Sequence, residues 1–133
     1  MFVCRPYSVG VKTHMRYPKW IRVRQNLDRK RLDDPYRHTY NQLTSLPENL
    51  FAWKDARIAI TAGSRYISNL ISITKAVVDY ISSKGGRPFL VPAMGSHGGA
   101  TSHGQVKVLE EIGLTEDTLG VPIHSSIEVV RLG

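Results

Sequence analysis

The residues with the clearest chemical potential lie in the stretch "VPAMGSHGGATSHG" at 91–104. Small residues surround His97 there, namely Gly95, Ser96, Gly98 and Gly99. An unperturbed imidazole has a pKa of about 6.5, so a histidine can accept or donate a proton near neutral pH. Glycines let the backbone approach a ligand closely and turn N–H groups toward an anion. The stretch therefore predicts a bare loop on which His97 exchanges a proton with a bound ligand.

A second polar segment, "AGSR" at 62–65, follows another apolar run. The planar guanidinium of Arg65 suits a carboxylate or a phosphate, and Ser64 beside it offers a hydroxyl. An arginine that binds an anion beside a histidine that transfers a proton suggests an enzyme acting on a small carboxylic acid. The alternative stays open that His97 is a solvated loop residue, that Arg65 pairs with a carboxylate of the chain, and that the serines are turn residues.

The glycine loop does not carry the usual nucleotide or metal motifs. Gly95 and Gly98 lack the G-x-G-x-x-G spacing, and no Lys-Ser/Thr pair follows the glycines as in a P-loop. Met94 stands where a nucleophile elbow, G-x-S-x-G, needs its first glycine. His97 and His103 lack the i, i+4 spacing of a helical metal pair, so we assign no metal ligand. His103 is expected at the surface, near the start of a helix.

Strand and helix patterns alternate around both polar segments. Short apolar runs at 57–62 and 87–93 predict buried strands. Between them, apolar residues recur at helical spacing over 66–86, and Gly85 and Gly86 supply a left-handed stop. Each polar segment therefore follows directly after a predicted strand.

The remainder of the chain continues the alternation. Ser102 with Gln105 three residues later forms a capping-box pattern for a second helix, which Gly113 ends. The residues "TEDTLG" predict a turn, and "IEVVRLG" at 127–133 predicts a final strand or its beginning. This order predicts an α/β fold with a parallel-sheet, Rossmann-like βαβ arrangement. Ligands of such sheets bind beyond the carboxyl ends of the strands, where both polar segments lie.

Charge and pattern differ in the N-terminal part of the chain. Residues 1–32 carry nine Lys and Arg side chains and one acidic residue, so they hold nearly all of the formal net charge of +7. The alternation at 19–28 predicts a strand, and 36–53 can hold a helix that Pro47 interrupts. A basic segment can bind nucleic acid, but no nucleic-acid motif accompanies this one, so we expect a solvated or partner-packed surface.

Composition excludes several classes of protein. The single cysteine, Cys4, excludes an intramolecular disulfide framework. No apolar run reaches the roughly 18–20 residues of a membrane helix, and the N-terminus has no secretory pattern. These features favour a reducing cytoplasm and no membrane association.

Taken together, the two loops resemble a known family. The segments "RIAITAGSR" and "PAMGSHGGAT" at this separation are similar to the N-terminal part of the nickel-dependent lactate racemase family, in a branch with "ITAGSRGI" and "PAMGSHGGAT" signatures. The resemblance covers 57–133 well and 19–56 loosely. We therefore expect a basic N-terminal arm at 1–18 and, at 19–133, the N-terminal α/β domain of a larger two-domain protein.

The resemblance implies a reaction and a cofactor. The family's enzymes racemise or epimerise 2-hydroxy acids with a nickel pincer nucleotide derived from nicotinic acid. A histidine takes the hydroxyl proton while a hydride passes to the cofactor, and the keto acid receives the hydride back on either face. The implied partner is a small 2-hydroxycarboxylic acid.

The resemblance also assigns residues. His97 takes the place of a catalytic histidine, Arg65 that of an arginine near substrate and cofactor, and Ser64 that of a threonine. Ser64, Arg65 and the small residues around His97 would bind substrate or cofactor and shape the pocket. Three departures from the family pattern leave the particular hydroxy acid open, and they fall on Ala62, Tyr66 and Gly98.

Other parts of the family's active site have no counterpart here. Its second histidine, the lysine that anchors the cofactor and the metal-ligand histidine would lie beyond residue 133, so we expect no racemisation by this chain alone. A truncated sheet would expose apolar surface, for which self-association is one remedy. Two alternatives remain: a module that binds a nucleotide or phosphate without chemistry, and a basic interaction protein.

Overall fold

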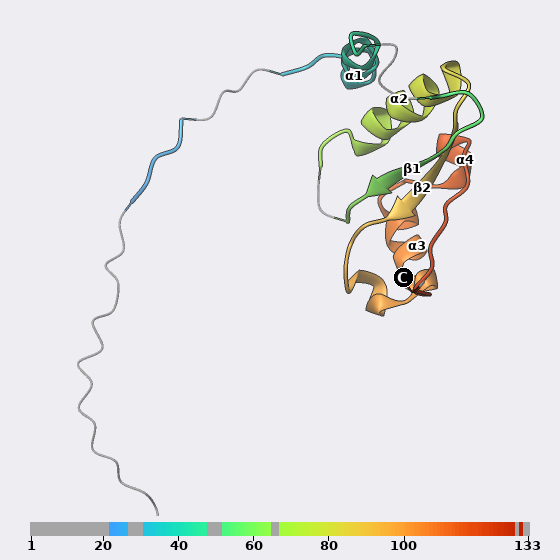
Figure 1. Ribbon diagram of the computed structural model, residues 1–133. Coiled ribbons are helices and arrows are strands. Elements are labelled where there is room, and N and C mark those ends of the chain that lie inside the picture. Colours follow the sequence, from blue (N-terminus) through green and yellow to red (C-terminus); the bar gives the residue numbers. More distant parts are fainter. Residues whose placement is uncertain (1–21, 27–30, 48–51, 65–66, 130, 132–133) are drawn as a thin grey trace, which may run out of the picture. The chain divides into compact units, whose positions relative to one another are not determined.

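The computed structural model describes residues 22–26, 31–47, 52–64, 67–129 and 131. The chain divides into two units, Met1–Lys30 and Arg31–Gly133, and the named helices and strands all lie in the second (Figure 1). The strand predicted at 19–28 is wrong for its described part, because residues 22–26 form no regular structure. Val23 there is 74% exposed, so no described residue covers the apolar side of this alternation.

The sheet is built from two parallel strands, β1 (Arg57–Ala62) and β2 (Arg87–Pro92). Their register pairs the first residues and the last residues of the two strands, so both strands end at the same edge. Figure 1 shows the two arrowheads side by side at that edge. The predicted parallel pairing is confirmed, in an α/β arrangement.

A third segment joins the sheet beside β2, earlier in the chain than predicted. Leu90 bridges Ile123 in parallel, its N–H donates to the Pro122 carbonyl at 2.9 Å, and its carbonyl accepts from His124 N–H at 2.8 Å. The described residues of the predicted strand, 127–129, are not in a strand. Ile127 and Val129 are 64% and 93% exposed, so their apolar character reflects no packing within the described part of the chain.

Helices follow each strand and one precedes the sheet. The described α-helices are α1 (Pro35–Thr44), α2 (Leu70–Ser83), α3 (Ser102–Glu111) and α4 (Glu116–Leu119). Gly85 takes a left-handed φ of 81° just after α2, as the predicted stop requires. The predicted turn in "TEDTLG" is instead the short helix α4, because Thr115 forms a capping box with Thr118. Among the described residues no helix is long and apolar enough to cross a membrane.

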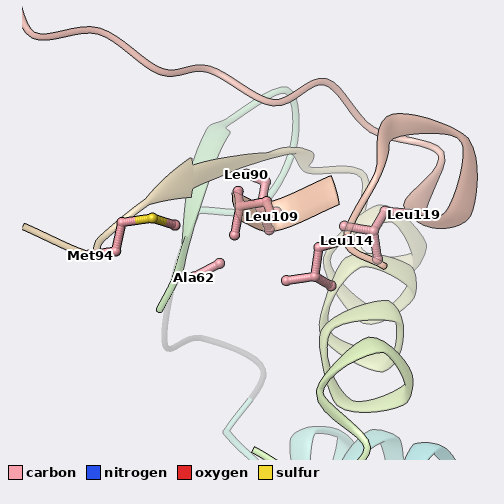
Figure 2. Packing of buried hydrophobic residues seen from close by; sticks show 6 residues of the cluster. All are labelled: Ala62, Leu90, Met94, Leu109, Leu114 and Leu119. Carbon is pink, nitrogen blue, oxygen red and sulfur yellow. The ribbon is translucent and has the colours of Figure 1, made fainter. Parts of the chain in front are cut away.

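The core lies between one face of the sheet and helices α2, α3 and α4. Alternate strand residues point into it, and Leu90 of β2 is fully buried against Leu109 of α3. Figure 2 shows the buried cluster of Ala62, Leu90, Met94, Leu109, Leu114 and Leu119. Burying one such leucine stabilises the fold by roughly 1.5–3 kcal/mol. Met94 belongs to the glycine loop, so the core also fixes the first part of that loop.

The described residues cover the opposite face of the sheet less completely than the core face. Ala59 and Thr61 of β1 are exposed, and Arg57 places its guanidinium carbon 5.3 Å from the centre of the Phe89 ring. His124 packs edge-on against the same ring, with its ring centre 5.0 Å from that of Phe89. The prediction of buried strands therefore holds for the core face and is wrong for this face.

Helix α1 packs on α2 through tyrosine side chains. The Tyr36 hydroxyl donates to Asp79 Oδ2 at 2.8 Å, and Tyr40 lies edge-on to Tyr80 of α2. The hydrogen bond to the Asp79 carboxylate raises the pKa of Tyr36 above its ordinary value, with desolvation adding to it. The helix predicted within 36–53 is thus present, and it ends before Pro47.

Candidate functional site

The two polar segments begin side by side at the carboxyl edge of the sheet. Ala62 pairs with Pro92 at the last position of the register, and Ala93 N–H donates to the Ala62 carbonyl at 2.7 Å, one residue past β2. Ser64 follows β1 by two residues and His97 follows β2 by five. The pairing of the strands therefore brings together two segments that lie more than thirty residues apart in the sequence.

Ser64 and His97, both predicted as site residues, are in direct contact. Ser64 Oγ lies 2.5 Å from Nδ1 of His97. Ser64 is half-buried, whereas His97 is exposed. The second ring nitrogen, Nε2, is not part of this hydrogen bond. A histidine held at one nitrogen and exposed on a loop can present the other nitrogen to a ligand.

Other predicted site residues have different positions. Arg65 lies outside the described residues, so its role stays a prediction. The Ser96 carbonyl accepts from Ala100 N–H at 3.2 Å, and its side chain makes no capping hydrogen bond, which is the behaviour of a turn residue. His103 lies in α3 and is exposed, as predicted.

The glycines shape the loop through left-handed backbone conformations. The short 3₁₀ segment η2 (His97–Ala100) contains Gly98 and Gly99, whose φ angles are 64° and 68°, and Ala100 follows with a φ of 54°. Residues with a Cβ adopt this region at a cost of roughly 1–2 kcal/mol each, so glycine is the favoured residue at the first two positions. The result is a tight reversal immediately after His97, which keeps the imidazole at the outer surface of the loop.

The backbone of this reversal lies in direct contact with the backbone at the start of α3. A Cβ placed on Gly98 would lie 2.2 Å from the carbonyl carbon of Gly104, and one on Gly104 would lie 1.8 Å from the carbonyl oxygen of Gly98. Both distances are far inside van der Waals contact. Glycine at both positions is therefore what lets the loop lie directly on the first turn of the helix.

Side chains at the start of α3, including its cap, form two further connections to the loop. Thr101 caps the helix by accepting from Gly104 N–H at 3.0 Å, and its hydroxyl donates to the Gly98 carbonyl at 3.1 Å. Gln105 donates from Nε2 to the Gly95 carbonyl at 2.9 Å. The predicted capping box of Ser102 with Gln105 is wrong, because Thr101 is the cap and Gln105 binds the loop instead.

Sequence reasoning missed the residues that hold the loop in place. Thr101, Gly104 and Gln105 were not predicted as part of the site, although all three lie within a turn of the predicted helix start. A glycine inside a helix costs about 1 kcal/mol relative to alanine, and this is the signal that could have identified Gly104. The described residues contain no group of three or more His, Cys, Asp or Glu side chains that could hold a metal ion.

Comparisons of the chain with protein-family models, with curated proteins and with solved structures give no match.

Proposed function

We propose that the glycine loop with His97 is the proton-transfer element of an enzyme that inverts a small 2-hydroxycarboxylic acid. The observation that carries the proposal is the contact between Ser64 Oγ and His97 Nδ1 at the carboxyl edge of a parallel sheet. Substrates of such sheets bind at this edge. The choice of racemisation over another acid–base reaction comes from the resemblance of the two loops to the lactate racemase family.

The proposed reaction requires His97 to accept one proton and later to return it. A hydride can leave C2 of a 2-hydroxy acid to give a keto acid when the hydroxyl proton leaves as well. His97 takes that proton and returns it when the hydride comes back to the opposite face of the carbonyl. Because the imidazole is exposed and held at Nδ1, the nitrogen that faces the substrate hydroxyl is Nε2. Arg65, which the resemblance assigns to the anion, would hold the carboxylate.

A nickel pincer nucleotide, when bound, would supply the hydride acceptor for this reaction. The loop is suited to the organic part of such a group, because a Cβ on Gly95 or Gly99 would meet no atom within 4 Å. The outer surface of the loop is therefore open at both glycines. These residues would bind and orient the substrate and the cofactor, and His97 would move the proton. No metal ligand is assigned among them.

The proposal includes a finer description of the fold. The strand order β1, β2, Ile123, all parallel, is the order expected when helices cross over on one face of a Rossmann-like sheet. In such a fold the second face of the sheet is covered as well. The patch around Phe89 would then be an internal surface of a larger α/β structure.

A second candidate is a module that binds a nucleotide or phosphate without chemistry. The open space at Gly95 and Gly99 favours it as well, since room for a ligand requires no acid–base group. The two candidates differ in what they demand of His97. Binding alone tolerates its loss, whereas proton transfer does not.

The test compares two histidine variants of the natural full-length protein supplied with the nickel pincer nucleotide. A panel of single-enantiomer 2-hydroxy acids is incubated with each, and chiral chromatography measures the opposite enantiomer. We expect His97→Ala to lose general-base catalysis, a decrease of about 10²–10⁴-fold in kcat. His103→Ala is the matched control, because this histidine is also exposed and lies six residues away on α3, and it should retain the rate. Equal rates for both variants would refute the role of His97.

A further inference from the structure

We infer that Ser64 is a positioning residue that holds His97 in the tautomer with its proton on Nδ1, so that Nε2 is free to accept a proton. This inference deepens the proposed function and rests on it for the direction of proton transfer. The hydrogen bond from which it starts belongs to the structure independently of any activity. It gives Ser64 a role other than contact with substrate or cofactor.

The geometry fixes the ring at one nitrogen only. Ser64 Oγ lies 2.5 Å from Nδ1, and the two residues come from different loops. The loop of His97 is anchored at its base, because His97 N–H donates to the Met94 carbonyl at 3.3 Å and Met94 itself is buried in the core. Ala62, two residues before Ser64, is buried in the same core. Rotation of the imidazole about its side-chain bonds would break the contact with Ser64. The serine therefore determines which ring nitrogen faces outward.

A hydroxyl can make this hydrogen bond in two ways. If the serine O–H donates to Nδ1, the ring proton of neutral His97 is on Nε2, and the outward nitrogen is a donor. If Nδ1–H donates to the serine oxygen, Nε2 has a free lone pair and is an acceptor. Removal of a hydroxyl proton from a substrate requires the second arrangement.

The second arrangement also suits the protonated ring. After His97 has accepted a proton, both ring nitrogens carry hydrogen, and Nδ1–H still needs an acceptor. The oxygen of Ser64 accepts in both states, so the hydrogen bond persists while the proton moves on and off Nε2. A neutral hydroxyl orients the ring without adding the negative charge that a carboxylate partner would bring.

The first test is spectroscopic and needs no turnover. Long-range ¹H–¹⁵N correlation spectra of the histidine side chains distinguish the two neutral tautomers, and His97→Ala identifies the His97 signals. We expect the Nδ1–H tautomer in the unaltered protein, a mixture of both tautomers in Ser64→Ala, and its return in Ser64→Thr, which keeps the hydroxyl. An Nε2–H tautomer in the unaltered protein, or an unchanged spectrum in Ser64→Ala, would overturn the inference. Backbone amide spectra establish that each variant is folded.

The second test is kinetic and separates positioning from binding. Loss of the partner that orients a metal-ligating histidine typically costs about 10–100-fold in activity, and we expect a loss of similar size when a proton-transferring histidine loses its partner. Ser64→Ala should lower kcat to that extent with KM unchanged, and Ser64→Thr should restore kcat. A rise in KM with kcat unchanged would mean that Ser64 contacts the substrate instead. If the unaltered protein shows the Nδ1–H tautomer but racemises nothing, the proposed function fails while the role of Ser64 in orienting His97 stands.

Discussion

Replacing Gly104 by alanine separates two physical expectations that have opposite signs. Gly104 lies in the first turn of α3, where alanine is the better helix former by about 0.8–1 kcal/mol. Helix propensity alone therefore predicts a more stable protein. The contact between the glycine loop and the helix predicts the reverse.

The magnitude follows from the distances around Gly104. A Cβ there would lie 1.8 Å from the Gly98 carbonyl oxygen and 2.8 Å from Thr101 Oγ1. The first of these atoms belongs to the backbone, which cannot move away by a change of rotamer. Overpacking of this kind costs about 1–3 kcal/mol, and a backbone clash belongs at the upper end. After the gain in helix propensity, we expect a net loss of about 2 kcal/mol.

The measurement is the free energy of unfolding from urea titration, with the thermal midpoint as a second readout. For a folded unit of roughly one hundred residues, 2 kcal/mol corresponds to a fall in Tm of about 8 °C or more. Gly99→Ala is the control, because Gly99 lies in the left-handed loop with a φ of 68° but no atom lies within 4 Å of its Cβ. It should cost about 1 kcal/mol, from the left-handed backbone alone.

The reasoning would be refuted by a Gly104→Ala protein that is more stable than the original. The His97 side-chain signals provide a second criterion, since a displaced loop cannot keep Ser64 and His97 in contact. Unchanged His97 signals in a stabilised variant would show that the loop does not lie against α3.

Two further predictions concern the elements that support the loop and the sheet. Thr101→Ala should destabilise the protein by about 0.5–2 kcal/mol in urea unfolding, because it removes the cap of α3, and Thr101→Ser should retain most of the stability. Tyr36 ionises at higher pH when folded than when unfolded, since its hydroxyl donates to Asp79. The stability it contributes is present below the ordinary tyrosine pKa of 10.0 and is lost as the pH rises through the folded value. Urea unfolding on either side of pH 10 should show this alkaline loss, and Tyr36→Phe should abolish it.

Elements with strong local signals were predictable from the sequence. The strands β1 and β2, the helix between them and its glycine stop all have a pattern that their own residues set. The meeting of Ser64 and His97 could also be expected, because it depends only on two adjacent parallel strands ending at one edge. From the sequence alone, the adjacency of the two strands was only a hypothesis, and the register of the sheet confirms it.

The features that the sequence left undetermined depend on contacts between distant or ambiguous groups. Thr101 and Ser102 are adjacent and both are good caps, so the sequence does not distinguish which one begins α3. A glycine inside a helix marks Gly104 as unusual, but its contact with the backbone of Gly98 is a feature of the tertiary structure. Residues 22–26 alternate like a strand, but a strand also needs a neighbour to pair with.

The most direct test of the proposed reaction is the isotope at C2 of the product. The natural full-length protein, supplied with the nickel pincer nucleotide, is incubated in deuterated water with one enantiomer of a 2-hydroxy acid. Chiral chromatography separates the opposite enantiomer and mass spectrometry measures its deuterium content. Proton transfer by His97 coupled to hydride transfer predicts inverted product that keeps its original hydrogen at C2. Deuterium at C2, or no inverted product from any acid with the cofactor shown to be bound, would contradict it.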